Sequence, residues 1–266
     1  MDMMGVILLI GFAGLGLLLG SFLGVVIHRG PQIWGLVESE GEDQTLSLAW
    51  PPSHCPSCKT RLRPVELIPI LGYLFARGRC RHCETPIPRF YPIVESLGLF
   101  AGVISALLFA SPLMAGASLA FFLLLIAMAA IDARTGYLPD ALTLPLLTLG
   151  LGAGAFGIFV TAQDAILGWV IGWGCLAALA ALYRLLRGRE GLGGGDAKLL
   201  GAGAAFTGPY VLPIMLALAA SSALIGALLM GKGRLDGATE IRFGPWLAGA
   251  IAAVFILQRI WPALPL

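Results

Sequence analysis

The sequence predicts an all-α polytopic membrane protein, with about eight transmembrane helices and a small zinc-ribbon-like domain between the first and the second. Its 266 residues are 58% hydrophobic and only 12% charged, and the mean hydropathy is +0.89, far above that of soluble globular chains. Apolar runs of membrane-spanning length recur along the chain, and one polar stretch holding four of the five cysteines interrupts them. The net charge of +2 suggests no nucleic-acid partner.

The first apolar run, Gly5–Ile27, has 23 residues, which is enough to cross a hydrocarbon core of about 30 Å. A cleaved signal peptide would carry a basic residue before its apolar run. Here no Lys or Arg precedes the run, whereas His28 and Arg29 follow it. These flanking charges favour an uncleaved transmembrane anchor, residues 1–27, with its N-terminus outside.

The polar stretch, residues 28–91, is predicted to be a small cytoplasmic domain. It contains Cys55-Pro-Ser-Cys58 and Cys80-Arg-His-Cys83, with 21 residues between the two motifs. Four thiolates from two such turns can surround Zn²⁺ as a tetrahedron. The alternatives are two disulfides, which a reducing cytoplasm disfavours, or unpaired thiols. Because four cysteines leave no open coordination position, we expect a structural zinc ion.

The remaining residues, 92–266, are predicted to form a transmembrane domain of seven further apolar segments. They are Pro92–Ala110, Leu113–Ile131, Leu138–Val160, Asp164–Leu186, Asp196–Thr207, Tyr210–Met230 and Pro245–Ile260. The segment that begins at Asp196 is too short to cross the membrane at full thickness. We therefore expect a short or re-entrant element there, which would let water reach the cytoplasmic half of the bundle.

The positions of the basic residues predict the orientation. With the N-terminus outside, sixteen of the seventeen Lys and Arg residues fall on the cytoplasmic side, and Arg259 is the exception. The sixteen are Arg29, Lys59, Arg61, Arg63, Arg77, Arg79, Arg81, Arg89, Arg134, Arg184, Arg187, Arg189, Lys198, Lys232, Arg234 and Arg242. Cytoplasmic loops of membrane proteins are enriched in these residues. Asp132 and Asp196 are therefore predicted to share the cytoplasmic face.

Two aspartates at the ends of apolar segments are the candidate catalytic residues. Asp132 follows the run Phe121–Ile131, and Asp196 follows three glycines. A carboxylate in such a position is costly and indicates function. Two carboxylates about 3 Å apart cannot both ionise, so that one serves as base and the other as acid. This pairing is the core of an aspartic protease.

Two other classes of protein remain alternatives. A transporter or ion channel could use intramembrane aspartates to relay protons or bind cations, although both aspartates lie near one face. A non-catalytic assembly scaffold could use the zinc domain to hold a partner, but it leaves the paired aspartates unexplained.

Six further residues are candidates for supporting roles: Glu95, Asp140, Glu190, Gly193, Gly195 and Lys198. Glu190 and Lys198 flank Asp196 and are expected either to tune it or bind substrate carboxylates, or to be interfacial charges. The glycines permit close approach of another backbone. Asp140 follows a proline and is predicted to cap a helix, whereas Glu95 places a costly charge within an apolar run.

These residues resemble the type IV prepilin peptidases, membrane aspartic proteases that process the precursors of pilins and type II secretion pseudopilins. The matching motifs are Gly20-Ser-Phe-Leu-Gly-Val-Val-Ile-His-Arg29, the two cysteine motifs, Pro92-Ile-Val-Glu95, Asp132 through Leu138-Pro-Asp140-Ala-Leu-Thr-Leu-Pro145, Gly193-Gly-Gly-Asp196-Ala-Lys198 and Phe243-Gly-Pro245. The Gly-x-Gly-Asp element alone is shared with presenilin-like intramembrane proteases. Its combination with the four cysteines and the Leu-Pro-Asp run is highly specific.

The resemblance implies that Asp132 and Asp196 are catalytic and that prepilin leaders are cut after a glycine. It places the protein in the bacterial inner membrane with its active site facing the cytoplasm. Many family members also methylate the new N-terminal residue with S-adenosylmethionine, an activity associated with the cysteine motifs. Gly24 stands where the family usually has Asn, so this chain departs from the motif and lacks that side-chain amide. No methyltransferase fingerprint occurs in the sequence, so methylation rests on resemblance.

Overall fold

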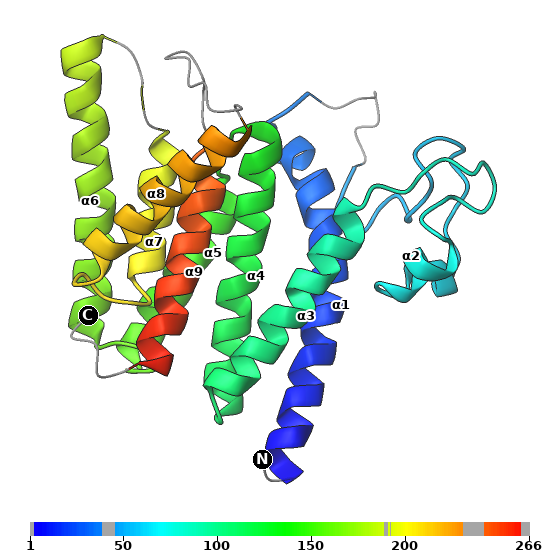
Figure 1. The fold of residues 1–266 in the computed structure, drawn as a ribbon, viewed down its shortest axis with the longest axis horizontal. Coiled ribbons are helices and arrows are strands. Elements are labelled where there is room, and N and C mark those ends of the chain that lie inside the picture. The colour runs from blue at the N-terminus through cyan, green and yellow to red at the C-terminus, as the bar shows by residue number, and fades with distance from the viewer. Residues whose placement is uncertain (1–2, 39–45, 189–190, 192, 231–241, 262–266) are drawn as a thin grey trace. The chain divides into compact units, whose positions relative to one another are not determined.

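The computed structural model describes residues 3–38, 46–188, 191, 193–230 and 242–261. Regular structure in this part of the chain is helical, apart from two isolated β-bridges. The chain forms two compact units, residues 1–123 and 124–266, which divide within one long helix. The ribbon in Figure 1 shows the helices of each unit.

Each of the eight predicted apolar segments forms a helix. They are α1 (Met3–Ile33), α3 (Phe90–Leu108), α4 (Pro112–Thr135), α5 (Asp140–Ala155), α6 (Ala162–Arg187), α7 (Gly194–Ala204), α8 (Leu212–Met230) and α9 (Gly244–Ile260). By length and composition, α1, α3, α4, α6 and α8 could cross a membrane, and α5 and α9 are shorter apolar helices. With 11 residues, α7 extends only about 16 Å, so it is too short to cross alone, as predicted.

In the first unit, α1 and α3 pack side by side through glycines (Figure 1). A Cβ atom added to Gly16 of α1 would overlap the carbonyl oxygen of Gly98 in α3, and one added to Gly98 would overlap the carbonyl oxygen of Gly16. Gly102 approaches the backbone of Phe12 in the same way. Small residues at such crossings let two membrane helices make backbone contact.

The cysteine domain, described residues 46–89, connects these two helices. It contains a 3₁₀ turn η1 (Pro64–Leu67) and the short helix α2 (Leu71–Phe75). Its two cysteine turns repeat one geometry: Lys59 N–H donates to Cys55 O, and Glu84 N–H donates to Cys80 O, both at 2.9 Å. Lys59 and Glu84 both have φ of 56°, which closes each turn in the left-handed region.

In the second unit, the short helix α7 is central and packs against α5, α6 and α9. All its residues from Leu199 onward are buried. Two glycines permit this packing, because a Cβ atom on Gly201 would lie 2.9 Å from Trp173 Cβ and one on Gly203 would lie 2.7 Å from Ile251 Cδ1. The first turn of α7, which carries Asp196, is thereby held within the bundle.

Candidate functional site

Asp132 lies in the last turn of α4, with only 5% of its surface exposed. Its Oδ2 accepts a hydrogen bond of 3.1 Å from the backbone N–H of Gly244, the first residue of α9. A Cβ atom on Gly244 would lie 2.7 Å from the same oxygen, closer than real Cβ atoms approach. The start of α9 therefore holds the carboxylate, and only glycine allows that contact.

Arg242 holds the backbone beside Asp132. Its guanidinium donates to the carbonyl oxygen of Asp132 at 3.4 Å and also to that of Ala133. Carbonyls in the last turn of a helix lack partners within the helix, so this arginine caps α4. Sequence reasoning used Arg242 only to assign the orientation. The available signal was the run Arg242-Phe-Gly-Pro245, a basic residue just before a helix start.

Asp196 occupies the first turn of α7 and is 7% exposed. It lies close enough to Asp132 for the two charges to interact. The structure thus brings the two predicted aspartates together, although 63 residues separate them in the sequence. The unpaired N–H groups and dipole at a helix N-terminus provide a favourable environment for a carboxylate.

The three glycines before Asp196 have different surroundings. A Cβ atom on Gly195 would lie 2.8 Å from Leu138 Cβ, and one on Gly193 would lie 3.4 Å from Asp196 Oδ2. No atom lies within 4 Å of a Cβ on Gly194. Only Gly195 is therefore required on steric grounds, because it lets the Leu138-Pro-Asp140 turn lie against the start of α7.

Lys198 makes a bidentate ion pair with Asp140, with Nζ at 2.6 Å and 2.8 Å from the two carboxylate oxygens. Both side chains are about half exposed. Asp140 does not cap its own helix: Pro139 is the N-cap residue of α5, and the carboxylate binds the lysine instead. The pair ties the start of α5 to α7, two residues beyond Asp196. Glu190 lies outside the described residues.

Glu95 belongs to the first unit, where it is half-buried in α3. Its Oε1 accepts a hydrogen bond of 2.9 Å from the Ser21 hydroxyl in α1, and its Oε2 accepts one of 2.6 Å from the backbone N–H of Ile70. The Glu95 carboxylate, whose charge the sequence analysis expected to be costly in an apolar run, therefore has two hydrogen-bond donors. These bonds link α1 and α3 to the residue that precedes α2.

The four cysteines form one cluster, with all sulfur atoms within 4.8 Å of one another. Cys55 Sγ lies 3.7 Å from Cys83 Sγ, and Cys58 Sγ lies 3.8 Å from Cys80 Sγ. Sulfurs that surround a tetrahedral zinc ion at about 2.3 Å are about 3.8 Å apart. All the cysteines are free thiols. The cluster therefore fits a tetrahedral metal ion, as the sequence predicted.

In each turn the hydroxyl of a threonine forms a hydrogen bond with the second cysteine. The sequence analysis did not identify these threonines. The Thr60 hydroxyl lies 3.4 Å from Cys58 Sγ, and that of Thr85 lies 3.3 Å from Cys83 Sγ. Hydrogen bonding with Thr85 lowers the pKa of the Cys83 thiol to about 6, which favours the thiolate that binds metals. The signal was a repeated Cys-x-x-Cys-x-Thr pattern.

Comparison with known proteins gives two family matches and a set of relatives that match most of the chain. Residues 15–110 match the bacterial peptidase A24 N-terminal domain, and residues 119–230 match the type IV leader peptidase family. A relative from Burkholderia pseudomallei, named prepilin leader peptidase/N-methyltransferase, is 42% identical over 90% of this chain and 82% of its own length.

Relatives with the same name occur in Pseudomonas aeruginosa and Neisseria gonorrhoeae. The first is 40% identical over 88% of this chain and 85% of its own length. The second is 38% identical over 95% of this chain and 92% of its own length. No solved structure matches the chain significantly.

Proposed function

We propose that this chain, which belongs to the type IV leader peptidase family, is a membrane aspartic endopeptidase that removes the leader peptides of prepilins and methylates the new N-terminal residue. The relatives' shared name supports both activities. The observation in this chain that carries the peptidase proposal is the pairing of Asp132 and Asp196, two buried carboxylates whose charges interact.

The proposed reaction is hydrolysis by general acid–base catalysis. The ionised aspartate takes a proton from water, and the protonated one donates to the carbonyl oxygen of the scissile bond. The roles exchange when the tetrahedral intermediate collapses. Because Gly244 N–H binds Oδ2 of Asp132, we assign Oδ1 of that residue to the water or the substrate. Two carboxylates that share a proton titrate as a pair, so the acid and the base are not assigned to one aspartate each.

The substrates are proposed to be prepilin and type II secretion pseudopilin precursors, cut on the cytoplasmic side of the bacterial inner membrane. The bias of Lys and Arg toward one side of the apolar segments supports an outside N-terminus. The proposed organisation is an anchor at 1–27, a metal domain at 28–91 and a protease domain at 92–266. Because α7 has only 11 residues, it cannot cross the membrane alone, which supports an active site that water reaches from the cytoplasm.

Two cofactors belong to the proposal. Cys55, Cys58, Cys80 and Cys83 would hold Zn²⁺, which stabilises the domain because four thiolates leave no open position for catalysis. S-adenosylmethionine would supply the methyl group, as the relatives' name implies. We assign none of this chain's residues to its binding.

The test is cleavage of a prepilin peptide, spanning leader and apolar segment, by the purified protein in detergent. We expect Asp132→Asn and Asp196→Asn each to lower kcat by about 10²–10⁴-fold while thermal unfolding is unchanged. Asp164→Asn is the matched control, because Asp164 is bound to Thr161 at the start of α6 and should leave the rate unchanged.

Wild-type rates in either active-site variant would refute the aspartic mechanism and favour a transporter or a scaffold. The position of the cut separates the proposal from the other Gly-x-Gly-Asp proteases. Cleavage within the apolar segment, and not at its leader boundary, would indicate a general intramembrane protease.

A further inference from the structure

A segment of the cysteine domain presents a large apolar surface to its surroundings. The segment is 64–75, which comprises η1 and α2. Six of its side chains are between 42% and 69% exposed: Val65, Leu67, Ile68, Leu71, Leu74 and Phe75. A domain in water rarely exposes so many large apolar side chains together. This surface therefore requires a partner of apolar character.

The position of the segment within its unit indicates which partner covers it. The backbone N–H of Ile70 binds the carboxylate of Glu95, the sixth residue of α3, about 8 Å along the helix from its start. Because α3 is long and apolar enough to cross a membrane, its first turns lie at the boundary between water and lipid. The start of α2 is thus held at the level of that boundary.

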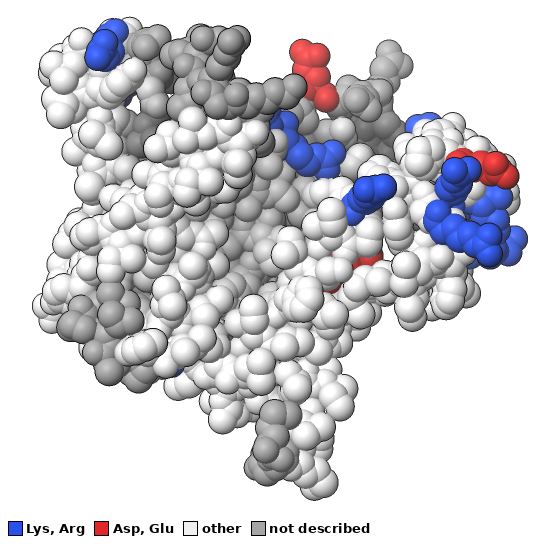
Figure 2. Space-filling model, viewed as in Figure 1, with Lys and Arg blue, Asp and Glu red and all other residues white. Residues whose placement is uncertain are grey.

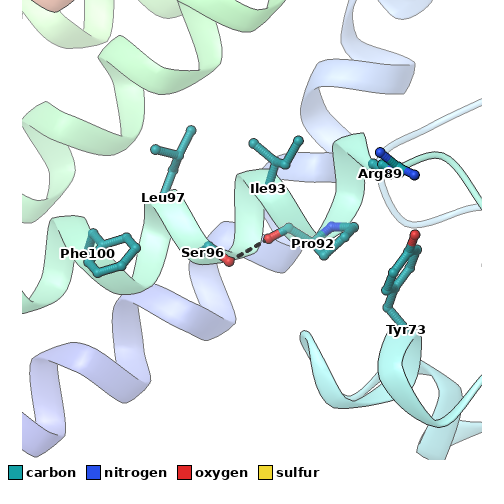
Figure 3. A pocket seen from close by; sticks show the side chains of 7 residues that line it. All are labelled: Tyr73, Arg89, Pro92, Ile93, Ser96, Leu97 and Phe100. Atoms are coloured by element: carbon teal, nitrogen blue, oxygen red, sulfur yellow. Dashed lines mark hydrogen bonds between the residues drawn. The ribbon is translucent and has the colours of Figure 1, made fainter. Parts of the chain in front are cut away.

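A groove between α2 and α3 has the polarity of a phospholipid (Figure 3). Its volume is about 470 Å³, and it is lined along α3 by Pro92, Ile93, Ser96, Leu97 and Phe100. The Ser96 hydroxyl donates to the carbonyl oxygen of Pro92, and the other side chains along this wall are apolar. Arg89 and the hydroxyl of Tyr73 lie at one end, next to the start of α3. An acyl chain would follow the apolar side chains, and its phosphate would meet the guanidinium at the interface.

The charge of the cysteine domain favours anionic lipid. Seven exposed basic residues occur between 46 and 91, against two acidic residues, Glu66 and Glu84. The basic residues are Lys59, Arg61, Arg63, Arg77, Arg79, Arg81 and Arg89. Figure 2 shows the basic side chains gathered over this part of the molecule. Basic residues next to a membrane are attracted to anionic headgroups.

We infer that η1 and α2 form an interfacial anchor that lies in the headgroup region of the membrane that α1 and α3 cross. Its apolar side chains lie among the lipids, and an anionic phospholipid occupies the groove along α3 with its phosphate at Arg89. The anchor holds the cysteine cluster at the membrane surface. It does not depend on the proposed peptidase activity.

A depth measurement on the full chain tests the anchor. The protein carries p-acetylphenylalanine in place of Phe75, or of Arg61 as the control, and a hydroxylamine nitroxide labels that residue without touching the cysteines. It is reconstituted in vesicles of phosphatidylethanolamine and phosphatidylglycerol. We expect the label at 75 to collide with oxygen several-fold more than with a water-soluble nickel chelate, and the label at 61 to show the reverse.

Matching water-exposed behaviour at both positions would overturn the inference. A label at 75 shielded from both reagents would also overturn it, because it would indicate a protein partner or a second copy.

Lipid retention tests the groove separately. Purified Arg89→Gln and Arg61→Gln proteins are compared by native mass spectrometry after extraction with phosphatidylglycerol. We expect Arg89→Gln to lose most of the phosphatidylglycerol that the wild type and Arg61→Gln retain. Equal retention by the two variants would refute the assignment of Arg89 to a lipid phosphate. Both measurements are independent of prepilin cleavage, so failure of the proposed function would not affect them.

Discussion

Gly244 illustrates how a residue without a side chain shapes the carboxylate site. Its N–H binds Asp132 Oδ2 at 3.1 Å, and its Cα faces the same carboxylate so closely that a methyl group would displace it. The hydrogen bond requires the backbone of residue 244 to lie next to the aspartate. Only glycine fits at that distance, because it has no Cβ atom. The Asp132 side chain is therefore oriented by the first residue of another helix.

We predict that Gly244→Ala lowers kcat for leader cleavage by about 10-fold or more, since displacement of a catalytic group by about 1 Å can cost up to 10²-fold. The added Cβ would push the Asp132 carboxylate away from its position. The measurement is steady-state cleavage, with thermal unfolding as a check on folding.

Gly249→Ala is the matched control for this prediction. Gly249 lies in the same helix, is exposed, and has no atom within 4 Å of an added Cβ. Alanine favours a helix over glycine by about 1 kcal/mol, so this variant should keep its activity and unfold at an equal or higher temperature. Equal activities of the two alanine variants would contradict the steric argument.

The ion pair between Asp140 and Lys198 is predicted to position the start of α7. An exposed ion pair contributes only about 0–1 kcal/mol to stability, but this one ties α5 to the turn that carries Asp196. We expect Lys198→Gln to lower kcat by about 10-fold with little change in KM or unfolding temperature. Lys198→Arg keeps the pair and should restore most of the rate. A loss confined to KM would instead assign Lys198 to substrate binding.

At the scale of elements, the α1–α3 contact depends on glycines that meet backbone to backbone. Gly16 lies against Gly98, whereas Gly14, two residues before it in α1, has no atom within 4 Å of an added Cβ. The two positions therefore separate the effect of packing from the effect of helix propensity. Such crossings are stabilised by close van der Waals contact.

We predict that Gly16→Ala destabilises the protein by about 1–3 kcal/mol, the usual cost of overpacking, and that Gly14→Ala has no such effect. Thermal unfolding in one detergent, followed by circular dichroism, compares the two. If both variants unfold at the wild-type temperature, that result would contradict the close backbone packing of α1 against α3.

At the scale of the whole molecule, the cysteine cluster and the two aspartates lie in different compact units. The metal is therefore expected to stabilise the cysteine domain without being required for the packing of α5 to α9. We predict that the purified wild type carries one equivalent of zinc. Cys80→Ser should lose that zinc, and its residues 46–91 should become sensitive to proteolysis while the other helices resist.

Cys175→Ser provides the control, because Cys175 is an exposed thiol in α6 outside the cluster. It should retain the full equivalent of zinc when measured by inductively coupled plasma mass spectrometry. Retention of zinc by Cys80→Ser would mean that the four sulfurs do not form the site.

The membrane class, the eight apolar helices, the grouping of the four cysteines and the two candidate aspartates were all predictable from the amino-acid sequence. These features depend on local properties: the length of an apolar run relative to the membrane, the spacing of thiols around one ion, and the cost of a carboxylate in an apolar segment. The resemblance to the type IV prepilin peptidases, which the comparisons confirm, came from the same short motifs.

The partners of individual side chains, in contrast, became known from the folded structure. The contact of Gly244 with Asp132, the pairing of Asp140 with Lys198, and the two donors to Glu95 all join residues distant in the sequence. No local pattern encodes such contacts, because they arise when helices pack and their ends meet. The exposed apolar face of η1 and α2 was likewise found only in the structure, because the sequence of a short Leu- and Ile-rich stretch does not distinguish an exposed segment from a buried one.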